Sequence, residues 1–263
     1  MRHDPYGTGV LTKDNPAEDD RLRLLEVALD PVSRAAVDGL PLPAAPRCLD
    51  LAAGRGSVAY WLAGRFPDGE VVAADIDPRY LDPTAAPNLE VLPFDAREET
   101  FPDASFDLVH TRSALKHLPE REEVLARLVR WVKPGGWVVA VDGYWFPSDE
   151  TANPAWAEVV QAVVDRMTAQ GGDMRWTRRL PALIARLGLA DVSVRLAPSL
   201  AGWDGWGAQH HEWLRATVEQ IGPTLVADGL LTEQALHRFL ATPDGPDLAE
   251  WFGLVAAVVG RVP

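Results

Sequence analysis

Cysteine is almost absent from this chain. With Cys48 alone, the protein can form neither an intramolecular disulfide nor a zinc site built from cysteines. Cys48 stands in an apolar run, which indicates a small buried hydrophobic residue. The histidines show no spacing that requires a metal, because adjacent residues such as His210 and His211 do not face one ion on a helix. We therefore expect no metal site.

Basic residues and long apolar runs are also scarce. The 263 residues include 25 Lys and Arg against 38 Asp and Glu, which gives a net charge of −13. Without a local basic patch a polyanion is repelled, so we expect no nucleic acid or anionic membrane as a partner. No stretch is long and apolar enough to span a membrane, and the N-terminus lacks an apolar signal core. These features lead us to expect a cytoplasmic protein.

Hydrophobic residues, at 47% of the sequence, suffice for a sizeable core. We divide the chain into an N-terminal helical segment (1–46), a central core (47–142) and a C-terminal part (143–263), all within one structural domain. The N-terminal helix is expected to start with Asn15 as its cap, followed by Pro16.

Apolar strands alternate with helices in the core. Strands are expected at Arg47–Ala52, Val71–Ile76, Leu89–Pro93, Phe106–Thr111 and Trp137–Val141, and helices at Val58–Phe66 and 120–132, the latter ended by Pro134-Gly135-Gly136. Continuous apolar strands alternating with helices are typical of a parallel sheet covered on both faces. The sequence therefore predicts an α/β fold.

The C-terminal part has a different pattern. Helices are expected at 154–170 and 210–228, and two final strands at Val192–Leu196 and Leu254–Val259. These two strands are expected to pair at the edge of the sheet. The later helices would then form a cap over the ligand-binding end.

A glycine-rich turn follows the first strand, in the segment CLDLAAGRGSVAYWLA (48–63). Asp50 ends the apolar run, and Ala52, Gly54 and Gly56 let a ligand approach the backbone before a helix begins. A tight strand-to-helix turn would give the same pattern. The spacing is not that of a dinucleotide fingerprint, and the acid disfavours a pyrophosphate. A cationic ligand such as S-adenosylmethionine, with its sulfonium and ammonium, suits the acid better.

A second acid, Asp75, ends the second strand about 20 residues after the glycine turn. At the carboxyl end of the sheet its carboxylate can accept both hydroxyls of a ribose. Asp77 would point elsewhere, so we prefer Asp75, and we assign the neighbouring Ile76 to the same site. The alternative is a surface aspartate that precedes the turn at Pro78.

The third and fourth strands add further candidates. Asp95 suits an adenine amino group, and Ala96 can supply a backbone donor beside it. His110 lies at the end of the fourth strand, beside the first strand, at the point of the sheet where ligands bind.

Five segments between about residues 47 and 142, taken in their order along the chain, resemble the class I S-adenosylmethionine-dependent methyltransferases. The segments that carry the resemblance are LDLAAGRGSVA, VVAADID, NLEVLPFDA, FDLVHTRSALKHLPE and VKPGGWVVAVD. With the RLRLLE and HLPEREEVL segments, the fuller pattern resembles actinomycete methyltransferases that tailor natural products.

The resemblance implies a Rossmann-like, doubly wound, seven-stranded sheet with an antiparallel last strand. It implies S-adenosylmethionine as the cofactor, with Asp50, Gly54 and Gly56 around its methionine part and ribose, Asp75 at the ribose, Asp95 and Ala96 at the adenine, and His110 near the methyl group. Tyr6 and Arg21 are further candidates. One departure is Ala52, which replaces the first glycine of the usual loop and is small enough for binding to survive.

Histidine is the natural base near neutral pH, and we assign His117 as the catalytic candidate. A capping or packed histidine is the alternative for His117. His210, His211 and Tyr144 are further candidates for the substrate side. The C-terminal part also holds tryptophans that suit either an aromatic substrate wall or the packing of the cap: Trp145, Trp156, Trp176, Trp203, Trp206 and Trp213.

The sequence thus predicts methyl transfer to a hydroxyl of a small apolar or aromatic natural product, with N- or C-methylation as the less favoured reaction. A homodimer is compatible with this prediction. One alternative is a protein that binds the same cofactor but catalyses cyclisation, decarboxylation or hydroxylation. A nicotinamide-dependent oxidoreductase is a second alternative, and a scaffold role is the least favoured.

Overall fold

The structure is a computed structural model that describes residues 11–151, 153–201, 208–242 and 250–263. Its chain divides into two units. Unit 1 comprises Met1–Leu29, Gly143–Arg175 and Ala197–Val255, and unit 2 comprises Asp30–Asp142, Trp176–Leu196 and Ala256–Pro263.

The described residues form a seven-stranded sheet of order β3-β2-β1-β4-β5-β7-β6, in which β7 is antiparallel. Its strands are β1 (Arg47–Leu51), β2 (Glu70–Asp75), β3 (Leu89–Pro93), β4 (Phe106–Arg112), β5 (Val132–Trp145), β6 (Ala190–Ala201) and β7 (Glu250–Arg261). The pairs β1–β2, β1–β4, β2–β3 and β4–β5 are parallel. The predicted fold class, including the pairing of the last two strands at one edge, is confirmed.

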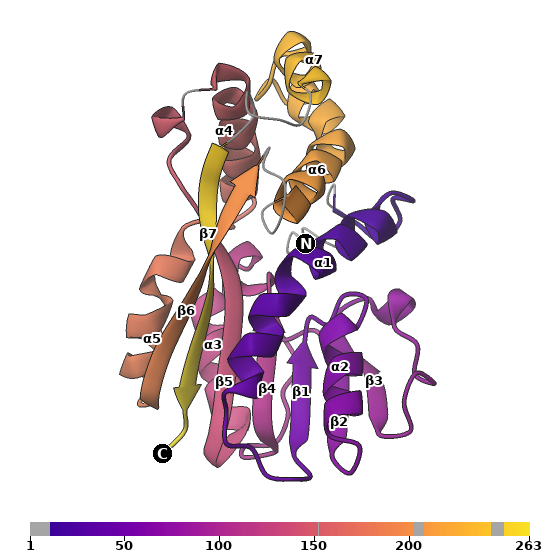
Figure 1. Cartoon of the computed structure of the whole chain (residues 1–263), viewed down its shortest axis with the longest axis vertical. Coiled ribbons are helices and arrows are strands. Elements are labelled where there is room, and N and C mark those ends of the chain that lie inside the picture. The colour runs from indigo at the N-terminus through magenta and orange to yellow at the C-terminus, as the bar shows by residue number, and fades with distance from the viewer. Residues whose placement is uncertain (1–10, 152, 202–207, 243–249) are drawn as a thin grey trace. The chain divides into compact units, whose positions relative to one another are not determined.

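Helices cover both faces of the sheet in unit 2 (Figure 1). Leu49 and Leu51 of β1 belong to a buried core that also includes side chains of α3 (Arg121–Trp131) and α5 (Leu180–Arg186). Successive strand residues point to opposite faces. Asp50 therefore faces the other side, where α2 (Ser57–Arg65) and the last part of α1 (Glu18–Asp38) lie. Cys48 is fully buried, as predicted, and burial raises the pKa of its thiol to about 12.

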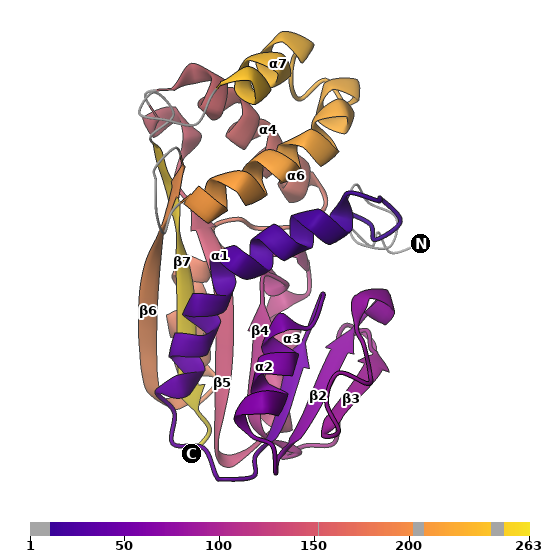
Figure 2. The same cartoon turned by 45° about the vertical axis from the view of Figure 1, so that its right-hand side comes forward.

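Unit 1 has a helical core of its own (Figure 2). It contains α4 (Pro154–Ala169), α6 (Ala208–Ala227) and α7 (Glu233–Ala241), whose apolar side chains pack together. Asn153 caps α4, because its side chain accepts the backbone N–H groups of the two residues after Pro154. Short 3-10 helices complete the described elements: η1 (Pro78–Tyr80), η2 (Leu115–His117), η3 (Ser148–Glu150) and η4 (Trp176–Arg179). No helix among the described residues is long and apolar enough to cross a membrane.

Some predicted boundaries were wrong. Pro134-Gly135-Gly136 does not end the helix before it, which stops at Trp131, but lies inside β5. The cause is tertiary: the Gly135 N–H donates to the Val262 carbonyl, and the Val262 N–H donates to the Gly136 carbonyl. At the N-terminus, the Asn15 side chain accepts the Ala17 N–H as a cap would, yet α1 begins at Glu18, two residues after the predicted start at Pro16. The sequence analysis missed α5 and α7.

Candidate functional site at the carboxyl ends of the parallel strands

The glycine turn after β1 has a backbone that few residues other than glycine adopt. Ala52, Gly54 and Gly56 have φ of 58°, 63° and 89°. A Cβ at Gly56 would lie 2.6 Å from the Tyr60 ring, whereas a Cβ at Gly54 would meet nothing within 4 Å. The turn therefore leaves open space at Gly54 and is tightly packed at Gly56. Of these three residues with positive φ, Ala52 is the one that is not glycine. It stands at the position where the resemblance predicts the first glycine of the loop.

Asp75 ties the end of β2 to this turn. Its Oδ2 accepts the Gly54 N–H at 2.7 Å, and its Oδ1 accepts the Asp77 N–H at 2.9 Å. The carboxylate is 6% exposed. A carboxylate is an acceptor with several lone-pair sites, which is the chemistry that ligand hydroxyls require. Ile76, next to it, is 41% exposed, which is high for a large apolar side chain beside a buried strand. Their assignment to the cofactor stays a prediction.

A buried hydrogen-bonded chain links β1, β4 and α1. Asp50 and His110 are register partners in the parallel pair β1–β4, and Asp50 Oδ1 lies 2.7 Å from His110 Nδ1. His110 Nε2 lies 3.1 Å from the Ser33 hydroxyl. His110 and Ser33 are fully buried and Asp50 nearly so. The predicted acid and histidine thus contact each other, and the chain fixes the imidazole at the end of the sheet where the strand order reverses.

A second cluster stands beside the glycine turn. The Arg112 guanidinium donates to Asp30 Oδ1 at 2.6 Å and to the Ser57 hydroxyl at 3.1 Å, and that hydroxyl donates to Asp30 at 2.7 Å. Arg34 pairs with the other oxygen of Asp30 at 2.8 Å. Two guanidinium groups thus share one carboxylate beside the turn. The sequence analysis missed this cluster because its members lie far apart in the chain.

Asp95 is held by its own loop. Its carboxylate accepts the side chain and backbone N–H of Arg97, at 2.7–3.1 Å. The Arg97 hydrogen bond lowers the pKa of Asp95 below its ordinary value, so the group is a carboxylate at neutral pH. The Ala96 carbonyl accepts the Arg127 guanidinium at 2.8 Å. The adenine assignment of Asp95 and Ala96 stays a prediction.

The loop after β4 holds the catalytic candidate. His117 ends η2, is 9% exposed, and donates its backbone N–H to the Ala114 carbonyl. Its neighbour Lys116 forms an ion pair with Asp142, at 3.3 Å from Nζ to Oδ1. The sequence analysis missed this pair. A signal existed, because Asp142 follows the apolar run of the fifth strand as Asp75 follows that of the second.

The other substrate-side candidates belong to unit 1. Burial lowers the pKa of His210 to about 4, so that its ring is neutral at physiological pH. The His211 ring lies 6.3 Å from that of Trp156. Of the two N-terminal candidates for the cofactor, Arg21 is buried and its guanidinium is bidentate to Glu18. Tyr6 lies outside the described residues.

The tryptophans are core residues where the structure describes them. Trp145, Trp156 and Trp213 are buried in the apolar core of unit 1, and Trp176 is buried in that of unit 2. This favours packing over an aromatic substrate wall for these four side chains. Trp203 and Trp206 lie outside the described residues.

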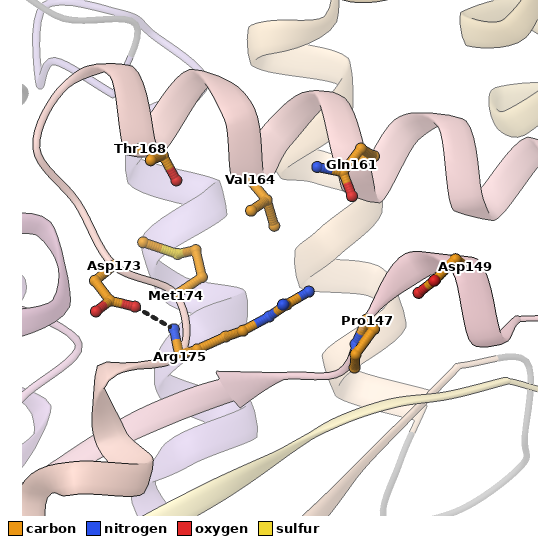
Figure 3. Close-up of a pocket in the computed structure, with 8 residues that line it drawn as sticks. All are labelled: Pro147, Asp149, Gln161, Val164, Thr168, Asp173, Met174 and Arg175. Carbon is orange, nitrogen blue, oxygen red and sulfur yellow. Dashed lines mark hydrogen bonds between the residues drawn. The ribbon is translucent and has the colours of Figure 1, made fainter.

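A pocket of about 650 Å³ opens in unit 1 (Figure 3). The Arg175 side chain extends along it beneath α4, and its backbone N–H donates to Asp173 at 2.9 Å. Charged and apolar side chains are mixed in the lining. The lining residues are Pro147, Asp149, Gln161, Val164, Thr168, Asp173, Met174 and Arg175. Across the described part of the chain, no three His, Cys, Asp or Glu side chains gather as metal ligands would.

Known proteins are similar to this chain in sequence and in fold. A methyltransferase domain profile matches residues 49–140. Methyltransferase str2 of Strobilurus tenacellus is 36% identical over 159 residues, which cover 57% of this chain and 55% of that relative, so the chain spans about half of its length. Trans-aconitate 2-methyltransferase of Methylobacterium radiotolerans is 31% identical over 192 residues, which cover 68% of this chain and 70% of the relative.

The fold has a close counterpart among solved structures. The mycolic acid cyclopropane synthase solved with S-adenosylhomocysteine (SAH) and CTAB superimposes with a TM-score of 0.61 over 93% of this chain and 95% of its own. At 14% identity this likeness supports the fold alone. The identity to the trans-aconitate enzyme, over more than two thirds of both chains, and the domain profile establish that this chain belongs to the class I S-adenosylmethionine-dependent methyltransferases.

Proposed function

We propose that this protein transfers a methyl group from S-adenosylmethionine to an oxygen of a small, mostly apolar or aromatic acceptor. The observation that carries the proposal is the hydrogen bond from the Gly54 N–H to Asp75, at 2.7 Å. It holds a carboxylate beside an open, left-handed turn at the carboxyl end of the sheet, where ligands of such sheets bind. The family assignment supports the same reaction.

The residues present fit this cofactor. The turn at Gly54 has open space for a ligand, and the Asp75 carboxylate beside it is an acceptor of the kind that ribose hydroxyls require. Asp50 supplies negative charge below the turn, which favours a cationic methionine part over a pyrophosphate. When bound, the cofactor supplies an electrophilic methyl group on a sulfonium.

The chain's own task is then to align the acceptor and exclude water. Alignment contributes up to about 7–11 kcal/mol in favourable intramolecular systems, so a strong base is not required for every acceptor. For a neutral hydroxyl, a base adds about 10²–10⁴-fold, and we propose His117 for that role. A natural product is the proposed acceptor class, and the trans-aconitate relative makes small organic acids a second group to test.

Calorimetry with SAH, using NADH as the control, tests the cofactor. Saturable binding of SAH without binding of NADH is expected; the opposite result would favour the oxidoreductase. Release of SAH from S-adenosylmethionine in the presence of candidate acceptors then tests transfer. Conversion of an acceptor without release of SAH would favour the alternative in which the cofactor is bound but the methyl group is not moved.

A further inference from the structure

The inference concerns the buried ion pair between Lys116 and Asp142 in unit 2. Lys116 is 4% exposed and Asp142 is 2% exposed. Lysine is rarely buried to this degree. In many proteins, replacing a buried ion pair by apolar side chains of similar volume leaves stability unchanged or raises it. The burial of Lys116 and Asp142 therefore does not by itself indicate that the pair stabilises the fold.

The carboxylate of this pair is fixed by its other contacts. Asp142 Oδ2 accepts the backbone N–H of Lys116 at 3.1 Å and the indole N–H of Trp176 at 3.0 Å. Trp176 is itself fully buried. Asp142 is therefore held in one orientation, with Oδ1 directed at the Lys116 ammonium. The geometry makes Asp142 a positioning residue for the lysine.

The pair stands where the parallel strands end. The Ser113 N–H donates to the Val141 carbonyl at 2.9 Å, which places the loop after β4 beside the point of β5 where its pairing with β4 ends. Asp142 is the next residue of β5. Strand β4 pairs with β1, the strand that leads into the glycine turn. The pair is thus two strands away from β1, at the ligand-binding end of the sheet.

The second feature of the pair is the ratio of donors to charged partners at the ammonium, among the described residues. An ammonium carries three N–H groups. In the described part of the chain its one charged partner is Asp142, at 3.3 Å. A buried cationic group with donors to spare is suited to an anionic oxygen that arrives with a ligand.

We infer that Lys116 binds a negatively charged oxygen of the methyl acceptor, and that the acceptor is therefore an oxygen acid: a carboxylate or an acidic enol. The inference rests on the proposed function and narrows the class of acceptor to oxygen acids. The anionic oxygen forms a bond to the methyl carbon while the carbon–sulfur bond breaks. The bonding electrons stay on sulfur, which becomes the neutral thioether of SAH, and the acceptor becomes a neutral ester or enol ether. No proton has to leave, so no base is needed.

Calorimetry on SAH-saturated protein tests this inference with matched probes. The probes are trans-aconitate and benzoate, with benzamide as the neutral counterpart of benzoate and a small cyclic 1,3-diketone as the acidic enol. The variants are Lys116→Met, Lys116→Arg and Asp142→Asn, each checked for its melting temperature and its SAH affinity. SAH affinity should stay within about twofold of the parent, because neither residue is assigned to the cofactor.

We expect the parent to bind at least one of the acids and to bind benzamide at least tenfold more weakly than benzoate. Lys116→Met should weaken binding of the acid by tenfold or more, and Lys116→Arg should restore part of it. Asp142→Asn should weaken it by less than Lys116→Met does, because the ammonium remains but loses the carboxylate that positions it. A merely structural pair would weaken binding of benzoate and of benzamide alike in Lys116→Met. That result, equal binding of benzoate and benzamide by the parent, or an SAH-loaded parent that binds no acid would overturn the inference. Failure of the parent to bind SAH would instead refute the proposed function.

Discussion

Replacing Asp75 by alanine tests the cofactor site most directly. The carboxylate is 6% exposed and is pinned by the Gly54 and Asp77 N–H groups. If this carboxylate receives two ribose hydroxyls, Asp75→Ala removes two hydrogen bonds to a charged group. Each contributes about 1.5–3 kcal/mol. Since about 1.4 kcal/mol corresponds to tenfold in affinity, the loss of one bond weakens SAH binding about tenfold and the loss of both about 100-fold or more.

Asp77→Ala is the matched control. Asp77 lies two residues away, pairs with Arg79 at 2.8 Å, and is not assigned to the ribose. Calorimetric titration with SAH should therefore show near-parental affinity for Asp77→Ala and at least a tenfold loss for Asp75→Ala. Thermal melts of both variants separate a lost ligand contact from a collapsed turn. Unchanged SAH affinity in a folded Asp75→Ala variant would refute the ribose assignment.

Four further changes probe the site and the core. Gly54→Ala should cost about 1–2 kcal/mol of stability for its left-handed backbone and weaken SAH binding. Gly56→Ala should lower the melting temperature further, since its Cβ would lie 2.6 Å from the Tyr60 ring; equal melting of the two variants contradicts this account. His117→Gln should slow methylation of a neutral hydroxyl about 10²–10⁴-fold while SAH affinity is retained, and an unchanged rate removes it as the base. Burial lowers the pKa of His210 from 6.5 to about 4. Its contribution to the free energy of unfolding is therefore full above about pH 6.5, where the ring is neutral in both states, and is lost as the pH falls toward 4. Urea unfolding should therefore show about 2 kcal/mol lost between about pH 7.5 and pH 5, and a shallower slope in His210→Gln; parallel slopes contradict it.

The local pattern of the sequence predicted the parallel half of the fold well. Leu89–Pro93 matches β3 residue for residue, and Phe106–Thr111 falls one residue short of β4. These strands are short apolar runs bounded by turn residues, so consecutive residues are enough to identify them as strands. The acids that follow such runs could also be found, because the end of a parallel strand is a fixed place in the fold.

Elements whose form depends on a remote partner were predicted poorly. Pro134-Gly135-Gly136 has the composition of a turn, yet it lies in β5 because Val262, at the other end of the chain, pairs with it. The helix α7 follows a capping threonine, Thr232, and starts with Glu233. A helix this short is stable only when its apolar face packs on other helices, so the local sequence alone did not predict it.

The sequence by itself determined the α/β class, the glycine turn and the acids Asp50 and Asp75, because period and composition encode them locally. The partners of these residues were decided only by the tertiary structure. Ser33 and Asp50 meet at the His110 ring across 77 and 60 residues of chain, and Lys116 meets Asp142 across 26. Such contacts depend on which strands become neighbours and in which register, and that choice minimises the free energy of the whole core rather than of any one segment.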